Sequence, residues 1–243
     1  MGGVAAEALV RMGVGAITIA DHDTYAMTDI NRQIHCTERT IGQEKINVVG
    51  QKLVEINPDL RLATYQGLTP NNVDKIVGDC NLVINGMDDV RASIMLERAA
   101  RRRRKTIVDA WLTPYASVFV MTPESPHWEE FLDFPTKNMP VESITDDDVI
   151  ECLRREIKFT LSQFNAFEIV TEGLVEEVIT RSRPRPSLVP CVWLSGVLMA
   201  NEAMKLITKQ GRISTHWGVF YNQYDHQIRF YDAGDNCDAA PGG

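Results

Sequence analysis

The stretch GGVAAEALVRMGVGAITIAD, residues 2–21, decides the fold. Two glycines open a helix that we expect to run to Met12, and the glycine-rich residues 13–15 end it. Residues 16–21 then form a short buried strand that finishes on a carboxylate, Asp21. A helix start offers free N–H groups to a phosphate, and an acid after the next strand is placed to bind a ribose. The order is typical of the second half of a nucleotide site, although paired glycines near a chain start also fit simple flexibility.

Helices alternate with short apolar strands from this stretch to about residue 120. Further helices are expected at 43–56 and 90–104, with a short one opening at Thr69, and further strands at 60–66, 81–85 and 106–110. This alternation predicts crossover connections and therefore an α/β fold, with a mostly parallel sheet that carries helices on both faces. Near the end, residues 219–224 and 227–231 predict a β-hairpin.

The regular alternation of helices and apolar strands does not continue between residues 122 and 190. We expect an acidic helix capped by Thr145, a second helix over 166–180 and an extended arginine–proline segment after it. A long helix over 192–209 follows. We therefore interpret 1–243 as one domain, in which 122–190 is an irregular and helical insertion with a crossover loop.

Composition excludes several classes of protein. The net charge of −8 over 243 residues argues against a general nucleic-acid binder, although a local basic patch stays open. No apolar run approaches the roughly 20 residues of a membrane span, and no signal peptide is visible, so we expect a cytoplasmic protein. The five cysteines form no Cys-x-x-Cys pair, which argues against a disulfide framework and a four-cysteine zinc site.

Polar motifs follow the first strand in a fixed order. They are Asp21-His22-Asp23, Asn31-Arg32-Gln33, Gly42-Gln43-Glu44-Lys45, Asn57-Pro58 and Asp88-Asp89-Val90-Arg91. This set resembles the ThiF/MoeB/HesA superfamily, the adenylating enzymes related to ubiquitin activation. The resemblance covers residues 2 to about 120 and resumes in the late helix at 197–206. It implies a Rossmann-like fold, ATP and Mg²⁺ as cofactors, and adenylation of a carboxylate with release of pyrophosphate.

The resemblance also implies a role for individual residues. Those expected to contact the nucleotide are Gly2 and Gly3 under the phosphates, Asp21 on the ribose, Asn31, Arg32, Lys45 and Asp88. Arg32 and Lys45 would neutralise charge during attack at the α-phosphate, and Asp88 would hold Mg²⁺, which makes these three the expected catalytic residues. The alternative for each side chain is a structural one: Asp21 and Asp88 as turn residues, and Arg32 and Lys45 as surface charges.

The sequence departs from the family pattern at its start. The family's glycine loop has the form Gly-x-Gly-Gly and follows an apolar strand, whereas here Met1 occupies the x position. The first glycine and the first strand of the sheet are therefore missing, and we expect the native protein to be longer at its N-terminus. An arginine that relatives supply across a dimer and the zinc-binding cysteine pairs are missing too.

The carboxylate substrate stays open. We expect the C-terminus of a ubiquitin-like or sulfur-carrier protein, as in most branches of the superfamily. The early motifs look most like the branch that dehydrates threonylcarbamoyladenosine in tRNA, so tRNA is the alternative partner. A non-catalytic binding protein that lost its nucleotide loop is a third possibility. A homodimer is expected, because relatives associate and the late helix carries more apolar residues than one face needs: Leu194, Val197, Leu198 and Met204.

Three further features have two interpretations each. The run of basic residues 101–105 is either a solvated helix end or a patch for tRNA or an acidic partner. Cys191 is either a buried small residue or a nucleophile activated by a helix start. The basic loop 181–190 either guides the substrate across the nucleotide site or serves as a surface linker.

Overall fold

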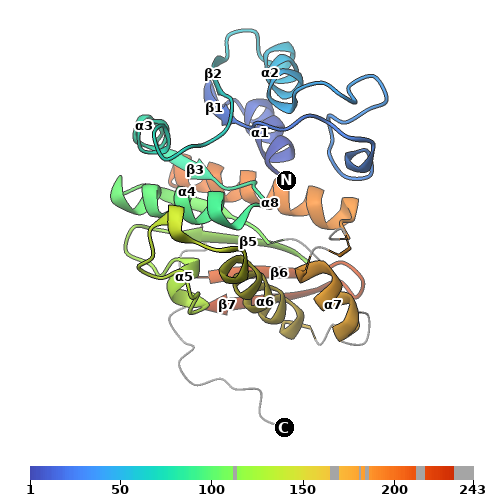
Figure 1. The fold of residues 1–243 in the computed structure, drawn as a ribbon. Helices are drawn as coiled ribbons and strands as arrows, with labels where there is room; N and C mark the ends of the chain where they lie inside the picture. Colours follow the sequence, from blue (N-terminus) through green and yellow to red (C-terminus); the bar gives the residue numbers. More distant parts are fainter. Residues whose placement is uncertain (112–113, 165–169, 181, 184–185, 212–216, 233–243) are drawn as a thin grey trace.

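The computed structural model describes residues 1–111, 114–164, 170–180, 182–183, 186–211 and 217–232 (Figure 1). The elements of the first part are α1 (Gly2–Arg11), β1 (Ala16–Ala20), the 3₁₀ turn η1 (Met27–Asp29), α2 (Lys45–Ile56), β2 (Arg61–Tyr65), α3 (Val73–Asp79), β3 (Leu82–Ile84), α4 (Val90–Arg102) and β4 (Thr106–Asp109). Those of the second part are β5 (Ala116–Met121), α5 (Trp128–Phe131), η2 (Val141–Ser143), α6 (Asp146–Ser162), α7 (Glu172–Ile179), α8 (Val189–Thr208), β6 (Trp217–Asn222) and β7 (Gln227–Asp232).

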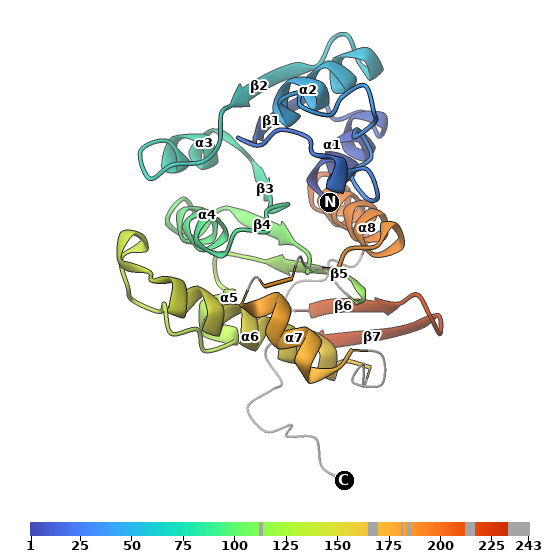
Figure 2. The same cartoon turned by 45° about the vertical axis from the view of Figure 1, so that its right-hand side comes forward.

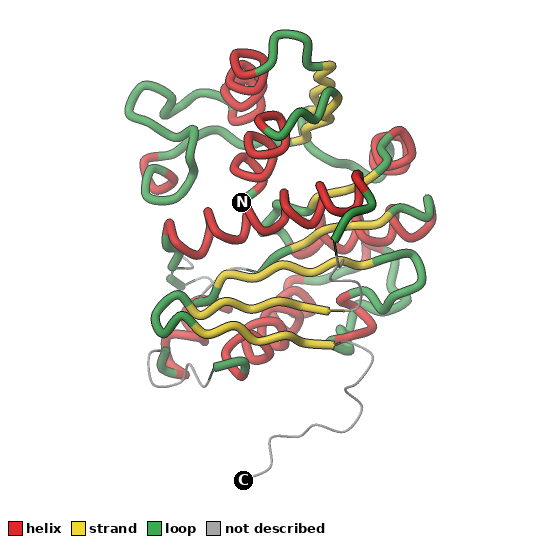
Figure 3. Tube along the Cα trace, turned by 180° about the vertical axis from the view of Figure 1, so that it is seen from behind, coloured by secondary structure: helices red, strands yellow, loops and turns green. Residues whose placement is uncertain are grey.

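The described strands form two sheets. One pairs β1 with β2, and the other has the order β3-β4-β5-β6-β7, in which neighbouring strands lie side by side (Figure 3). The predicted α/β fold and the C-terminal hairpin, β6 with β7, are confirmed. Parallel pairing is confined to β1–β2 and β3–β4. From β4 onward the sheet is antiparallel, because the connection from Asp109 to Ala116 is too short for a crossover helix.

Helices cover both faces of the larger sheet. Successive side chains of a strand point to opposite faces, so Val118 and Val120 of β5 pack with Met199 of α8, whereas Phe119 and Met121 pack toward α4 and α6. Figures 1 and 2 show α8 and α1 on one side of this sheet, and α4, α5 and α6 on the other. Every residue of β5 is buried, as expected for a strand covered on both faces.

The predicted insertion 122–190 is largely helical and packs on the sheet. Thr145 caps α6: its side chain accepts a hydrogen bond from the Asp148 backbone N–H at 3.2 Å, and Asp148 accepts from the Thr145 N–H at 2.8 Å. The acidic start of α6 is therefore explained by capping. The expected helix over 166–180 begins later, at Glu172, and residues 165–169 lie outside the described part of the chain.

Helix α1 lies unusually close to two other elements. A Cβ atom placed on Gly86, just after β3, would lie 2.8 Å from the Cα atom of Gly2. A Cβ atom placed on Gly196 of α8 would lie 2.7 Å from the Cβ atom of Val4. Both distances are shorter than carbon atoms tolerate, so the glycines allow α1 to lie directly against β3 and α8.

We predict that Gly196→Ala destabilises the protein by about 1–3 kcal/mol, because the added methyl group forces α1 and α8 apart. Gly173→Ala in α7 is the matched control, since nothing lies within 4 Å of the added atom. The control should be neutral or slightly stabilising. Urea unfolding of both variants checks this, and equal midpoints would show that the α1–α8 contact is not tight.

Candidate functional site

Three predicted site residues, Arg32, Lys45 and Asp88, act on the start of α1, where Gly2 and Gly3 lie. The pKa of the Met1 amino group is lowered to about 6, mainly by burial. The positive charges of Arg32 and Lys45 contribute to the lowering, and the negative charge of Asp88 opposes it. The three predicted catalytic side chains therefore all influence the pKa of the same group, the Met1 amino group at the beginning of α1. Because the first N–H groups of a helix have no acceptor within it, the beginning of α1 is also a source of hydrogen-bond donors.

A buried carboxylate joins the two cationic side chains. Asp29, 6% exposed, accepts a hydrogen bond from Arg32 Nη2 at 3.1 Å and lies 3.9 Å from Lys45 Nζ. It also accepts from the Gln33 side chain at 2.7 Å and from the Ala26 N–H at 3.0 Å. Asp29 is therefore a positioning residue for both cations. Sequence reasoning missed it, although its spacing of three residues from Arg32 is typical of side chains that meet on one turn.

Lys45 has a second carboxylate partner. Its Nζ atom donates to Asp23 Oδ2 at 2.8 Å, and this hydrogen bond lowers the pKa of the Asp23 carboxyl. Burial alone would lower the pKa of Lys45, but the hydrogen bond with Asp23 and the negative charges of Asp23, Asp29 and Asp21 together outweigh burial, and the pKa is raised. The ammonium group is therefore charged and held in place at neutral pH.

Asp21 and Asn31 have mainly local partners. Asp21 follows β1 directly, and its Oδ1 atom accepts from the Asp23 N–H at 2.9 Å, which closes a tight turn at the strand end. Asn31 donates through Nδ2 to the Ser187 carbonyl at 3.2 Å and accepts from Arg32 Nη1 at 3.1 Å. The Asn31 amide therefore links the Asn-Arg-Gln motif to the segment before α8. Its expected contact with a nucleotide would be a second role.

Asp88 presents an open carboxylate. It lies exposed in the loop between β3 and α4, and no hydrogen bond or ion pair of its side chain is recorded within the described part of the chain. The adjacent Asp89 has a different task, since it caps α4 by accepting from the Ala92 N–H at 2.8 Å. Mg²⁺ bound to nucleotides commonly takes one or two carboxylates, with phosphate and water completing its shell. The single open carboxylate of Asp88 fits this requirement.

Cys191 is a packed thiol. It is fully buried, its Sγ atom donates to the Pro114 carbonyl at 3.0 Å, and Gln223 Nε2 donates to it at 2.9 Å. Burial raises the pKa of this thiol to about 11. The structure therefore favours the interpretation of Cys191 as a buried small residue over that of an activated nucleophile.

The arginine run at the end of α4 is neutralised by neighbouring acids. Arg101 pairs with Glu130 at 2.5 Å, Arg102 and Arg103 pair with Asp74 at 2.9 and 3.3 Å, and Arg104 pairs with Glu124 at 2.5 Å. Each arginine thus has a carboxylate partner on the protein itself. This supports a solvated helix end and weakens the interpretation as an RNA-binding patch.

Together, the α/β fold and a cluster of cations at a glycine-rich helix start define a nucleotide-binding class of protein. The ThiF family model matches residues 1–239, and the chain belongs to the ThiF family. It is 36% identical over 110 residues to tRNA threonylcarbamoyladenosine dehydratase of Escherichia coli K12, which covers 44% of this chain and 41% of that protein. It is 31% identical over 101 residues to adenylyltransferase and sulfurtransferase MOCS3 of Culex quinquefasciatus, which covers 41% of this chain and 23% of that protein.

A solved structure agrees on the fold. The crystal structure of selenomethionine PaaA matches 96% of this chain and 69% of its own, with a TM-score of 0.67 at 15% identity. The chain spans about half or less of the length of the curated relatives it matches, 41% and 51% for the first two. Among the described helices, none has the length and apolarity that crossing a bilayer requires.

We predict that Cys191 is unreactive in the folded protein, because its thiol is buried and protonated. Cys191→Ser should leave the number of rapidly reacting thiols unchanged, whereas Cys80→Ser, at a partly exposed position, should lower it by one. Titration with a chromogenic disulfide reagent, with and without denaturant, measures both. Loss of a fast-reacting thiol in Cys191→Ser would restore the nucleophile hypothesis.

Proposed function

We propose that this protein binds ATP and adenylates a carboxylate, with residues 1–243 acting as one adenylation domain. The observation that carries the proposal is the arrangement of Arg32 and Lys45, held by one buried carboxylate beside the start of α1. Membership of the ThiF family supports it, because one of the matched relatives is an adenylyltransferase and sulfurtransferase. Two fixed cations beside helical N–H groups form a binding site for a polyphosphate.

Each proposed residue has a distinct task in this reaction. The N–H groups at Gly2 and Gly3 would bind phosphate oxygens, and Asp21 would accept hydrogen bonds from ribose hydroxyls. A substrate carboxylate attacks the α-phosphorus, the bond to the β-phosphate breaks, and pyrophosphate leaves. Arg32 and Lys45 would stabilise the charge that spreads over the phosphate oxygens. Asp88 would hold Mg²⁺, which when bound neutralises phosphate charge.

For the carboxylate we propose the C-terminus of a ubiquitin-like or sulfur-carrier protein. The net charge of −8 and the paired arginines of α4 argue against a large RNA surface on the described residues. The tRNA alternative rests on a specific observation, the 36% identity with the E. coli dehydratase. A non-catalytic ThiF-like binding protein is the remaining candidate.

ATP–pyrophosphate exchange separates these three candidates. Exchange that depends on a small protein ending in two glycines supports the first substrate, and exchange that depends on tRNA carrying threonylcarbamoyladenosine supports the second. ATP binding without exchange in either arm, or no ATP binding, would support the non-catalytic alternative and contradict the proposal.

We predict that Lys45→Met and Asp88→Asn each lower the exchange rate by at least about 100-fold, because each removes a charge that stabilises the transition state. The matched controls are Lys52→Met and Asp79→Asn, which change exposed side chains outside the site. The controls should retain the wild-type rate. A folded Asp88→Asn protein with unchanged exchange would show that Asp88 does not hold Mg²⁺.

We further propose that the basic loop 181–190 guides the substrate. Arg181, Pro184 and Arg185 lie outside the described residues, but Ser187 contacts Asn31, and Trp193 Nε1 donates to the Arg32 carbonyl at 2.8 Å. The end of the loop is thus attached to the proposed nucleotide site.

Replacing Arg181, Arg183 and Arg185 by Ser should weaken substrate affinity and leave ATP affinity nearly unchanged, because only the substrate crosses the loop. Steady-state titration of each substrate at several salt concentrations measures this. Equal substrate affinity before and after would make the segment a linker.

A homodimer is also proposed, since Trp193 and Val197 expose apolar surface on α8, and sedimentation velocity tests it.

A further inference from the structure

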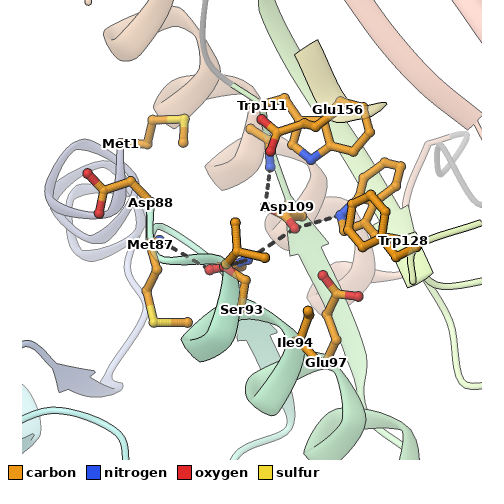
Figure 4. Close-up of a pocket in the computed structure, with 14 residues that line it drawn as sticks. Met1, Met87, Asp88, Ser93, Ile94, Glu97, Asp109, Trp111, Trp128 and Glu156 are labelled. Carbon is orange, nitrogen blue, oxygen red and sulfur yellow. Dashed lines mark hydrogen bonds between the residues drawn. The ribbon is translucent and has the colours of Figure 1, made fainter. Parts of the chain in front are cut away.

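A pocket of about 60 Å³ lies behind Asp88, between α4, β4 and the insertion (Figure 4). Its walls combine carboxylates with aromatic rings. The lining residues that matter here are Asp88 at one end, Glu97, Asp109, Trp111, Trp128 and Glu156. Adenylation, as proposed above, gives no role to the three inner acids and the two tryptophan rings, so the pocket requires its own explanation.

Asp109 contributes a fixed carboxylate. It is 4% exposed and stands at the end of β4. Its Oδ2 atom accepts from Trp128 Nε1 at 2.8 Å and from Asn85 Nδ2 at 3.1 Å, and its Oδ1 atom accepts from the Ala110 N–H at 2.7 Å. Three neutral donors orient the group without cancelling its charge. Burial raises the pKa of the Asp109 carboxyl to about 6, so above this pH the pocket contains a preorganised negative charge.

Glu97 contributes a second carboxylate with an unused oxygen. The residue is 3% exposed, and its Oε2 atom has no hydrogen-bond partner within the described part of the chain. The His127 Nδ1 atom lies 3.8 Å away, but burial lowers the pKa of His127 to about 4, so the ring is uncharged. Figure 4 shows the Glu97 carboxylate directed toward Asp109. Burial and the nearby Asp109 carboxylate raise the pKa of the Glu97 carboxyl well above its usual range, and a bound cation would favour its ionised form and supply a donor to the unpaired oxygen.

The aromatic walls specify the kind of donor. The rings of Trp111 and Trp128 lie 4.0 Å apart between centroids, and both line the pocket. No Lys, Arg or His is among the lining residues. Ring faces and carboxylates together attract an organic cation. A metal ion fits less well, because the described residues hold no group of three or more His, Cys, Asp or Glu side chains arranged to coordinate one.

We propose that this pocket binds an ammonium group of a small organic cation. The ammonium N–H groups would donate to Glu97 Oε2 and toward Asp109, while the indole rings cover its carbon side. This goes beyond the proposed adenylation and does not depend on it. Asp88 lines this pocket and also belongs to the proposed nucleotide site, so a cation in the pocket would lie next to the nucleotide.

The first test uses the unmodified protein and methylammonium chloride as the probe. In a ¹H–¹⁵N NMR titration, the Trp128 indole signal, assigned by its loss in Trp128→Phe, should shift and saturate. Ethanol, a neutral molecule of similar size, and sodium chloride at equal ionic strength should leave it in place. An equal response to ethanol would make the pocket a simple apolar cavity, and no response to methylammonium would also overturn the proposal.

The second test removes the unpaired acceptor. Glu97→Gln should weaken methylammonium binding by roughly tenfold or more, because a hydrogen bond to a charged group is lost. Glu124→Gln is the matched control, since this exposed acid pairs with Arg104 and does not line the pocket. Unchanged affinity in a folded Glu97→Gln protein would contradict the assignment. The titration needs no ATP, so its failure is independent of the outcome of the exchange assay.

Discussion

The close packing of α1 is the constraint on which the site depends. The two sheets share no strand within the described residues: the chain crosses between them through α3, and α1 packs against α2 on one side and α8 on the other. Gly86 allows the start of α1 to lie against the end of β3, and Gly196 allows its first turn to lie against α8. Asp88, in the loop after β3 of the larger sheet, and Arg32 and Lys45, between β1 and β2 of the smaller sheet, therefore all act on the amino group of Met1 at the start of α1.

Electrostatics then determines how the two cations are held. Two positive side chains near a helix start repel each other and the helix dipole, so the site costs free energy unless carboxylates balance it. Asp29 and Asp23 provide that balance, each through a hydrogen bond to one of the two cations. A polyphosphate would therefore meet side chains that are already oriented, which is the condition for strong electrostatic stabilisation.

The sequence predicted the features that depend on neighbouring residues. The period of the apolar residues predicted α1 to β4 and the hairpin. The ordered motifs named Arg32, Lys45 and Asp88, all of which act on the Met1 amino group, but the roles expected of these residues stay predictions. The antiparallel pairing of β5 with β4 was not predicted, because it depends on the length of a single connection. The roles of Asp29, Glu97 and Asp109 were not predicted either, because their partners come close only when the chain folds. Asp109 and Trp128, for example, are hydrogen-bonded although 19 residues separate them. Burial of such acids has no local sequence pattern.

The central claim is that the two sheets contribute to one nucleotide site. A double-mutant cycle on the Kd of Mg²⁺-bound ATP, measured by calorimetry for Lys45→Met, Asp88→Asn and the combined variant, tests it most directly. If both side chains act on the same bound phosphates, the two losses should not add, and the coupling should be at least about 0.5 kcal/mol. Strictly additive losses, or ATP affinity unaffected by either substitution, would contradict a shared site.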